Sequence, residues 1–388
     1  MSHAQSRLEV ITEPDAFLAL KDEWDRLWVE ANGHHNQAFR FCWLAWNHVA
    51  NPRGQRLRCI TYRENGRLTL VWPLVSYRRG IWRVLNTLTP GTVEQSSMLV
   101  ADGPAAAEAI AQAWHAATRL CGADVFFLPF VRAGTTLHDL ASAHKGLIEE
   151  KQSISSAALL RNEVDWTTLC KSLNRKPGIR ERRLGRQGEL DIRMLDLPDG
   201  EYQQSVDWIL SYKRDWAARV DKRGPWLYST AYRDFLVGLL ESAGGEPLAR
   251  IFVVELDKKV IASAMLGIGK GCHYYMIGSF VPEMKQFSPG TILNEFVIRW
   301  CLERRMDIDF GIGTEEFKAY WSRGNVKRTS SFQIANTLWG KVYFQSKDAA
   351  RAVSGIRSTK GSDTAGAQPA LPREAVQESE TPPVESRG

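Results

Sequence analysis

The sequence lacks the cysteine and histidine patterns of disulfide-linked and metal-binding proteins. Its six cysteines include no Cys-x-x-Cys pair, and its eight histidines do not cluster at the spacing of metal ligands. We therefore expect neither a disulfide framework nor a metal site. The adjacent residues His34 and His35 are interpreted as a solvated loop pair.

Long hydrophobic runs are also missing. No uninterrupted apolar stretch approaches the roughly 18 residues that a membrane helix needs, and the N-terminus lacks the basic and then apolar layout of a signal peptide. We therefore expect a cytoplasmic protein without a membrane span. A chain of 388 residues, of which 44% are hydrophobic, is long enough for two domains that each have a core.

Positive charge gathers in one segment of the chain. From Lys171 to Arg193, eight Lys or Arg residues stand against three acids, so this segment alone supplies +5 of the net charge of +6. It contains none of the aromatic residues on which proteins stack single-stranded RNA. We interpret it as a solvated basic helix that leads into a strand, with nucleic-acid binding as the less favoured alternative.

A pattern of strand, polar turn and strand occurs twice. Arg56–Arg78 reads as two strands around an Asn65–Gly66 turn, and Ala249–Gly271 repeats this plan. Each copy follows a helix-rich segment. We therefore expect two related α/β domains in tandem.

The two domains are predicted at residues 1–152 and 153–346. Their boundary is placed in the polar stretch near Glu149–Ser156. No aromatic residue follows Phe344, and the end of the chain is rich in Ser, Pro, Gly, Ala and Glu. Residues 347–388 are therefore predicted to form a disordered tail.

The most informative segment of the second domain begins at the Ser-Pro-Gly-Thr step. Ser288 is a preferred N-cap residue, Pro289 suits the first helical turn, and Gly290 lets a ligand approach the backbone. The N–H groups of the first turn would then face outward, where they suit a pyrophosphate. A capped helix start without any ligand is the alternative.

An acidic loop follows that helix and the next strand. The stretch from Met306 to Gly311 alternates like a short buried strand, and a turn at Gly311 and Gly313 opens on Glu315 and Lys318. Carboxylates therefore stand at the carboxyl end of a strand, which is a common ligand position. Asp309, within the strand, is either a proton acceptor or a cap for the Gly311 turn.

The order of hairpin strands, Ser-Pro-Gly-Thr helix and Asp309 strand resembles the acetyltransferase core of the GNAT superfamily. The resemblance is closer to its CelD-type branch, whose D-F-G-x-G-x-E-x-[YF]-K pattern reads here from Asp309 to Lys318. It implies an α/β (α+β) fold of two tandem GNAT-like domains, each a mixed, mostly antiparallel sheet flanked by helices. Two neighbouring strands would separate to admit the pantetheine arm of acetyl-CoA, and the next loop and helix would hold its pyrophosphate.

The resemblance also implies roles for residues. The backbone around Tyr275–Gly278 would polarise the thioester, Asp309 or Glu315 would accept a proton, and Tyr275 would donate one. Lys318 would contact a phosphate or an acceptor carboxylate, with a surface role as the alternative. Tyr274 and Tyr320 are alternative proton donors. Residues expected to hold the donor are Ile277, Gly278, Gln286, Ser288, Gly290 and Thr291. The usual signature, Gln/Arg-x-x-Gly-x-Gly/Ala, appears only in altered form, because Gln286 precedes Gly290 by four residues.

The first domain contains a similar step, Thr89 to Thr92, that no amphipathic helix follows. Without a helix start it offers no concentrated N–H groups, so the donor is assigned to the second domain. The first domain, with a degenerate donor site, would shape the acceptor cleft.

The resemblance implies an acyl-CoA-dependent N- or O-acyltransferase, most simply an acetyltransferase, that needs no metal. Its acceptor would be a small molecule or saccharide linked to envelope or exopolysaccharide synthesis. One alternative is a Fem-type aminoacyltransferase, which takes its acyl group from aminoacyl-tRNA and would give residues 171–193 an RNA role. Another is a non-catalytic GNAT-like assembly partner. The oligomeric state is not predicted.

Overall fold

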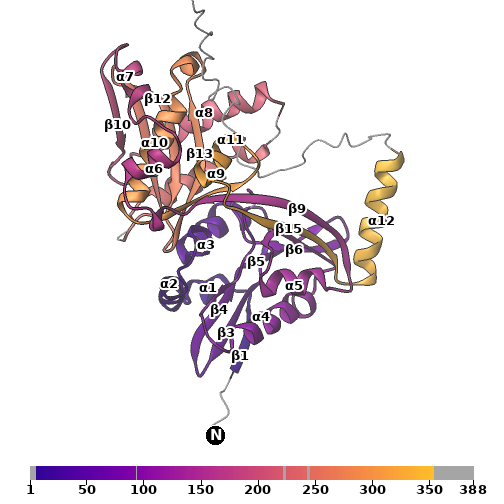
Figure 1. The fold of residues 1–388 in the computed structure, drawn as a ribbon. Helices are drawn as coiled ribbons and strands as arrows, with labels where there is room; N and C mark the ends of the chain where they lie inside the picture. Colours follow the sequence, from indigo (N-terminus) through magenta and orange to yellow (C-terminus); the bar gives the residue numbers. More distant parts are fainter. Residues whose placement is uncertain (1–5, 93, 222–223, 243–244, 354–388) are drawn as a thin grey trace, which may run out of the picture.

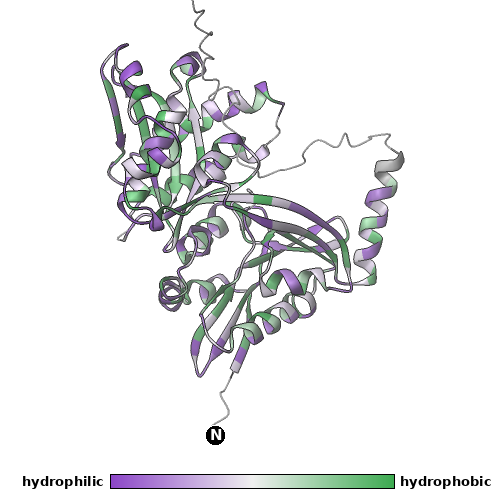
Figure 2. Cartoon of the chain, in the orientation of Figure 1, coloured by the Kyte–Doolittle hydropathy of each residue, from purple (hydrophilic) through white to green (hydrophobic). Residues whose placement is uncertain are grey.

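The computed structural model describes residues 6–92, 94–221, 224–242 and 245–353. They form an N-terminal and a C-terminal half, which share one long sheet (Figure 1). Hydrophobic residues, green in Figure 2, follow the strands and the inward faces of the helices in both halves. Each half therefore packs helices against a sheet, as the sequence predicts.

The N-terminal half contains a four-stranded sheet of order β1-β3-β4-β7 and part of the shared sheet. Its strands are β1 (Ser6–Ile11), β2 (Arg56–Leu57), β3 (Cys59–Glu64), β4 (Arg67–Trp72), β5 (Leu74–Arg79), β6 (Trp82–Thr87), β7 (Leu99–Val100) and β8 (Val125–Arg132). Its helices are α1 (Pro14–Leu18), α2 (Lys21–Glu30), η1 (His35–Gln37), α3 (Phe39–Ala45), η2 (Trp46–Ala50), α4 (Ala106–His115), η3 (Ala116–Leu120) and α5 (Thr136–Ser142). The predicted hairpin is confirmed, because Asn65 and Gly66 turn between β3 and β4 with positive φ.

The C-terminal half contributes the other side of the shared sheet. Its strands are β10 (Leu190–Met194), β11 (Ala249–Leu256), β12 (Lys259–Gly267), β13 (Cys272–Phe280) and β14 (Asp307–Ile312). Its helices are η4 (Leu160–Asn162), α6 (Trp166–Ser172), α7 (Ile179–Leu184), α8 (Gln203–Arg219), η5 (Pro225–Tyr228), α9 (Thr230–Leu240), η6 (Pro282–Phe287), α10 (Pro289–Glu303) and α11 (Glu316–Ser322).

Two long strands join the halves. β9 (Leu147–Ala158) lies between β14 and β15 (Val326–Ala335), and β15 pairs in turn with β8 of the N-terminal half. The shared sheet therefore has the order β10-β11-β12-β13-β14-β9-β15-β8-β6-β5-β2. The predicted boundary after residue 152 falls within β9, where Gln152 and Ser153 pair with Ser330 and Thr329.

Each half contains one parallel pair of strands at a comparable place. β13 runs parallel to β14, and β6 runs parallel to β8, whereas the other ladders among the described residues are antiparallel. This repetition agrees with the predicted duplication. It also agrees with the prediction of mixed, mostly antiparallel sheets.

The chain after β15 forms α12 (Leu338–Val353), at the edge of the N-terminal half (Figure 1). Tyr343 and Phe344 anchor it against Val84 and Val125. Residues 347–353 of the predicted tail are therefore helical, because a helix that packing has nucleated gains one hydrogen bond with each further residue. The rest of that tail, 354–388, lies outside the described residues.

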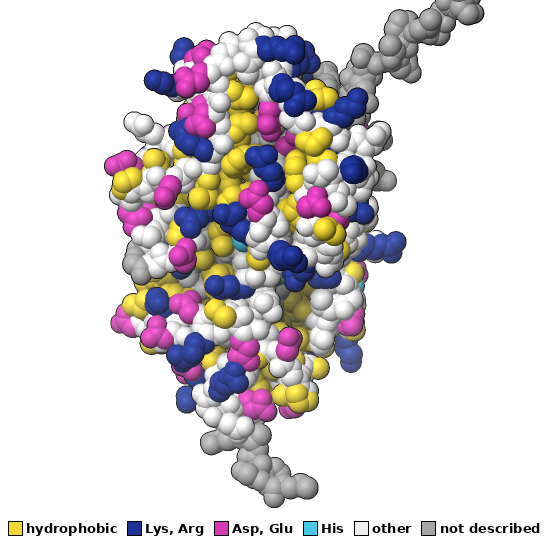
Figure 3. Space-filling model, turned by 60° about the vertical axis from the view of Figure 1, so that its left-hand side comes forward, with side chains coloured by type: hydrophobic (Ala, Val, Ile, Leu, Met, Phe, Trp, Pro, Cys, Tyr) yellow, Lys and Arg dark blue, Asp and Glu magenta, His cyan; other side chains and the backbone are white. Residues whose placement is uncertain are grey.

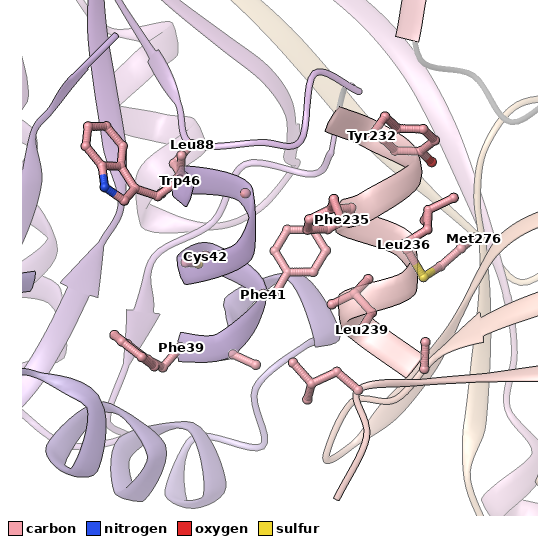
Figure 4. Close-up of a cluster of buried hydrophobic side chains, with 14 of the residues drawn as sticks. Phe39, Phe41, Cys42, Trp46, Leu88, Tyr232, Phe235, Leu236, Leu239 and Met276 are labelled. Atoms are coloured by element: carbon pink, nitrogen blue, oxygen red, sulfur yellow. The ribbon is translucent and has the colours of Figure 1, made fainter. Parts of the chain in front are cut away.

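A hydrophobic cluster packs the two halves against each other. Figure 4 shows Phe39 and Phe41 of α3 on one side and Phe235 and Leu239 of α9 on the other. The rings of Phe41 and Phe235 meet edge to face with centroids 5.0 Å apart. A fully buried Phe typically contributes about 1.5–3 kcal/mol, so this contact holds the halves in a defined relation.

Candidate active site

β13 and β14 pair at one end and separate at the other. Their parallel ladder joins Cys272 to Asp307, His273 to Ile308 and Tyr274 to Asp309, and it ends there within the described chain. β13 nevertheless continues to Phe280. The sheet therefore opens between these strands from Tyr275 onward.

A β-bulge lies at the start of this opening. Ile277 pairs with Met265 and Tyr275 pairs with Leu266, so Met276 has no partner on β12. A bulge redirects the backbone groups of the bulged strand. The strand that borders the opening thus carries peptide groups that the ladder with β12 does not use, within the predicted stretch Tyr275–Gly278.

Tyr275 and Gly278 are brought together in this strand. A Cβ atom on Gly278 would lie 2.5 Å from the Tyr275 hydroxyl, so glycine makes the space that the hydroxyl occupies. The Tyr275 ring packs beside Phe310 and Phe317. Burial raises the pKa of the Tyr275 hydroxyl, which therefore stays protonated and able to donate. Ile277, the neighbouring predicted residue, is buried.

A buried lysine that was not predicted also reaches β13. Lys213 of α8 donates a hydrogen bond from Nζ to the carbonyl oxygen of Gly278 at 3.0 Å, and only 6% of its surface is exposed. This hydrogen bond fixes the Gly278 peptide group near the opening. Because Lys213 follows a polar residue pattern on α8, the sequence favours a solvated side chain and gives no sign of this contact.

The start of α10 differs from the prediction in its capping. Ser288 has left-handed backbone angles (φ 54°, ψ 49°), and its side chain makes no capping hydrogen bond. The N–H groups of Thr291 and Ile292 both donate to the Ser288 carbonyl oxygen, at 3.0 and 3.2 Å. Pro289 has no N–H, and Gly290 is buried. The first turn therefore offers fewer N–H groups to an anion than predicted.

The basic segment lies beside this helix start. α7 packs against η6, where the Arg183 guanidinium lies 5.6 Å from the centroid of the Phe287 ring. Gln286 is exposed on η6. Cations of the basic segment and the predicted pyrophosphate site thus share one surface, although they are about 100 residues apart in the sequence.

One member of the basic segment is not solvated. The side chain of Arg175 is only 7% exposed and forms an ion pair with Glu295 of α10, and its guanidinium lies 5.0 Å from the centroid of the Trp321 ring. It also contacts Tyr320, whose hydroxyl donates to the Leu173 carbonyl oxygen at 3.2 Å. The interpretation of the segment as wholly solvated is therefore wrong for Arg175. Tyr320 is occupied in this packing.

Positive charge does not form a continuous track on the face that Figure 3 presents. Lys and Arg side chains (dark blue) alternate there with Asp and Glu (magenta). Nucleic-acid backbones bind most strongly where cations follow them without such acidic neighbours. The mixed charges on this face therefore argue against nucleic-acid binding there, in agreement with the interpretation of the sequence.

Glu315 and Lys318 form a buried pair in the loop after β14. Their Oε2 and Nζ atoms lie 2.9 Å apart, and Nζ also donates to the Ile312 carbonyl oxygen at 2.6 Å. Gly313 leaves space for the Glu315 carboxylate, since a Cβ there would overlap with it. Both charges thus hold the loop between β14 and α11, which favours a structural role over proton transfer or phosphate contact.

Asp309 fills the turn-capping role of its two predicted alternatives, and its role as proton acceptor stays a prediction. Its Oδ1 accepts a hydrogen bond from the Gly311 N–H at 2.6 Å, which caps the turn. Burial raises the pKa of the Asp309 carboxyl, whereas this hydrogen bond and the charges of His34, Lys318 and Lys327 lower it. A carboxylate with a raised pKa is a better proton acceptor than a solvated one.

Of the histidine pair, His34 is exposed as predicted, whereas His35 lies between the halves. His35 is 3% exposed, and its ring stacks on Tyr274 with centroids 4.4 Å apart and an interplanar angle of 10°. Burial lowers the pKa of His35 to about 3, so the ring is neutral. His34 interacts electrostatically with Asp309. The solvated interpretation is therefore wrong for His35.

A second carboxyl group, Glu94, reaches this region from the N-terminal half. Burial raises the pKa of Glu94 to about 7, against a smaller opposing effect of the hydrogen bond that Thr92 Oγ1 donates to it at 2.9 Å. Burial raises the pKa of Tyr274 and of Tyr232, and the charge of Glu94 raises both further. Glu94 is therefore near the Asp309 side of β13 and titrates in the neutral range, where acid-base catalysts operate.

Glu94 lines a small polar cavity of about 30 Å³, together with Trp72 and Ser96. Trp72 Nε1 and Ser96 Oγ are buried there without a hydrogen-bond partner in the described part of the chain. Such a space suits a water molecule or one polar group of a ligand. Sequence reasoning missed Glu94, because a single acid in a loop without regular structure carries no periodic signal.

Groups of three or more possible metal ligands do not occur among residues 6–353 wherever they are described. Helices long and apolar enough to cross a bilayer are likewise not found in that part of the chain.

Residues 175–319 match the family described as Acetyltransferase (GNAT) domain. This range contains β13, α10 and β14 entirely, so the match covers the opening and the helix start. No curated protein sequence matches the chain. Residues 175–319 are thus similar to a GNAT acetyltransferase domain, as the resemblance implies, and membership of the CelD-type branch stays a prediction.

Solved structures resemble nearly the whole chain. The structure titled "Crystal structure of FemX" has 14% sequence identity and a TM-score of 0.59, and the match covers 87% of this chain and 99% of that chain. A conserved protein of unknown function from Bacteroides thetaiotaomicron VPI-5482 has 10% identity and a TM-score of 0.51, with 84% and 99% covered. The likeness concerns the fold, and the repeated parallel pairs agree with a tandem GNAT-like arrangement.

Proposed function

We propose that this protein is an acyltransferase that moves an acyl group, most simply acetyl, from acyl-CoA to a hydroxyl or amine. The acceptor is a small molecule or saccharide that binds between the two halves. By the resemblance to CelD-type proteins, we propose an acceptor linked to envelope or exopolysaccharide synthesis and a cytoplasmic location.

The observation that carries this proposal is the opening between β13 and β14 with its bulge at Met276. An extended pantetheine arm needs a strand edge whose peptide groups are not already paired. β13 offers such an edge beyond Tyr274, within the range that the family match covers, although Lys213 already donates to the Gly278 carbonyl oxygen.

The chain has residues suited to hold the donor along this edge and beyond it. Backbone groups of Ile277 and Gly278 would pair with the pantetheine amides. Phosphates would lie toward the start of α10, where the proposed contacts are Gln286, Ser288, Gly290 and Thr291. Few N–H groups are free to bind phosphate at the start of α10, and Arg183 would compensate with its positive charge.

In the proposed mechanism the acceptor approaches from the side of His34 and Glu94. Asp309 takes the proton of the attacking hydroxyl or amine as the new bond to the acyl carbon forms. Backbone N–H groups of β13 near Met276 stabilise the negative charge on the acyl oxygen. The carbon–sulfur bond then breaks, and Tyr275 protonates the departing thiolate. Exchange with solvent then removes the proton from Asp309 and returns one to Tyr275.

A second candidate is Fem-type transfer from aminoacyl-tRNA. It is favoured by the likeness in fold to FemX over 87% of this chain. In that case the cations of α7 would meet RNA phosphates. The third possibility, a non-catalytic assembly partner, is favoured only by the reduced number of N–H groups at the start of α10.

Thermal unfolding with acetyl-CoA, a long-chain acyl-CoA, free CoA and aminoacyl-tRNA in parallel tests these candidates. A ligand present at about 100 times its dissociation constant should stabilise the protein by about 2.7 kcal/mol. We expect stabilisation by acyl-CoA and CoA. Stabilisation by aminoacyl-tRNA alone would favour the Fem-type function, and no stabilisation by any of them would favour the non-catalytic one.

A further inference from the structure

A second and larger pocket lies in the N-terminal half, where α4, α5 and the start of α12 meet. Its volume is about 480 Å³, which falls in the range of small-molecule sites. Trp114 of α4 and Leu140 of α5 supply apolar surface, and the chain around His144 and Asn336 forms the polar part. None of these residues belongs to the region around β13 and β14.

Three cations line this pocket without a compensating acid. Arg119, Lys145 and Lys341 make no ion pair with any carboxylate that the structure describes, and no carboxylate is among the lining residues. They come from η3, from the turn before β9 and from α12, so the fold gathers them from distant parts of the sequence. A multiply charged anion is the ligand that such a group attracts most strongly.

His144 adds a neutral donor to the same wall. Its Nδ1 accepts a hydrogen bond from the Gly146 N–H at 3.0 Å, so in the neutral ring the proton is on Nε2. Burial and the charge of Arg119 lower the pKa of His144, which keeps the ring neutral. The wall therefore offers an N–H donor beside three cations.

The side-chain amide of Asn336, at the other wall, is not satisfied by hydrogen bonds within the described chain. Its backbone N–H donates to the Asp124 carbonyl oxygen at 2.9 Å, but its side-chain Nδ2 and Oδ1 are both buried without a partner in the described chain. A buried polar group without a hydrogen bond typically costs about 1–3 kcal/mol. An amide that offers a donor and an acceptor together matches a hydroxyl group, which can accept and donate.

We propose that this pocket binds a phosphorylated sugar or polyol. The phosphate lies among Arg119, Lys145 and Lys341, and a hydroxyl group pairs with the Asn336 amide. Trp114 and Leu140 cover the carbon skeleton. The proposal does not depend on the proposed acyltransferase activity, because it uses none of the residues assigned to that activity.

Calorimetric titration of the full chain with glucose 1-phosphate, inorganic phosphate and glucose tests this site. We expect saturable 1:1 binding of glucose 1-phosphate with a dissociation constant below about 1 mM, weaker binding of phosphate and none of glucose. The double variant Arg119→Gln and Lys341→Gln should weaken both anions at least about tenfold, since charge-assisted hydrogen bonds are lost. Asn336→Ala should weaken glucose 1-phosphate and leave phosphate unchanged.

The matched control is Lys259→Gln, which removes an exposed cation at the far side of the C-terminal half and should change nothing. Equal weakening by Lys259→Gln would show unspecific attraction and overturn the proposal. So would the absence of saturable binding of glucose 1-phosphate to the wild-type chain. Loss of acetyl-CoA binding in the double variant would mean that the pocket serves the acyl donor, which would also overturn it.

Discussion

The ring of His35 stacks on the ring of Tyr274 across the boundary between the halves, with centroids 4.4 Å apart. His35 also meets Phe41 edge to face at 5.4 Å, and Phe41 belongs to the cluster that packs α3 against α9. Tyr274 is the last residue of β13 that pairs with β14. The N-terminal half thus supports β13 at the point where the opening begins.

Replacing His35 by Ala should destabilise the protein by about 1–3 kcal/mol, because a buried ring and its stacking partner lose contact. His35→Phe keeps the ring and gives up Nε2, which has no hydrogen-bond partner among the described residues, so its stability should stay near wild type. Denaturant unfolding of both variants measures this difference. An Ala variant as stable as wild type would show that the stack does not support β13.

Asp309→Asn should lower turnover by about 10²–10⁴ with donor affinity retained, because the amide keeps the size of the side chain but cannot accept the proton. Steady-state rates and acetyl-CoA affinity on an identified acceptor measure both quantities. A variant with the wild-type rate would leave Asp309 with its turn-capping role alone.

Glu315→Gln should act on stability and not on chemistry. It removes the carboxylate that pairs with the buried ammonium of Lys318, and breaking a buried pair typically costs about 3–5 kcal/mol. Urea unfolding and the turnover of the folded fraction separate the two effects. A stable Glu315→Gln variant without turnover would transfer the role of base from Asp309 to Glu315.

Glu94 predicts a stability that depends on pH. Its pKa rises from the ordinary value of 4.5 to about 7 in the folded protein. Between these values the unfolded chain has lost the proton while the folded chain retains it, so stability falls as the pH rises through this window. The fall should be about 3 kcal/mol and should be complete above about pH 7.

Glu94→Gln, which cannot ionise, should remove this fall. Denaturant unfolding at pH 5 and at pH 8, compared between wild type and variant, measures it. An equal pH dependence in both proteins would mean that Glu94 is solvated, and would also remove it from the candidate site.

Arg183→Gln should weaken acyl-CoA binding by about three- to tenfold and should reduce its dependence on salt, because a cation beside the phosphates is lost. The control is Arg304→Gln at the other end of α10, where the guanidinium lies 4.1 Å from the centroid of the Trp300 ring. That variant loses a similar ring contact without a proposed phosphate contact. Equal effects of the two substitutions would assign them to the stability of α10.

Local patterns predicted much of this fold. The Asn65–Gly66 hairpin, the helix that begins at Pro289 and the strand at Asp307–Ile312 all follow from turn residues and periodicity that a short window contains. The tandem arrangement follows from the repetition of such windows. Local patterns do not predict that β9 and β15 join the two halves in one sheet. The pairing of Thr329 with Arg132, for example, joins residues almost 200 positions apart.

The sequence predicted those residues of the candidate site that belong to one continuous segment. It did not predict the residues that reach the site through packing between distant elements. Asp309 and Tyr275–Gly278 belong to one segment, so motif order identifies them. His35, Glu94 and Lys213 gain their surroundings from packing between distant elements, and an isolated polar residue carries no sign of such a partner in the sequence. Capping at Ser288 also differed, because its left-handed backbone angles were not evident from residue type.

Hydrogen–deuterium exchange of the full chain, with and without acetyl-CoA, tests the central claim most directly. If the donor lies along β13, amides of Tyr275–Gly278 and of the start of α10 should become protected, while the loop at Thr89–Thr92 should not change. Protection of the Thr89–Thr92 loop with no change along β13 would contradict the account, because it would place the donor in the N-terminal half.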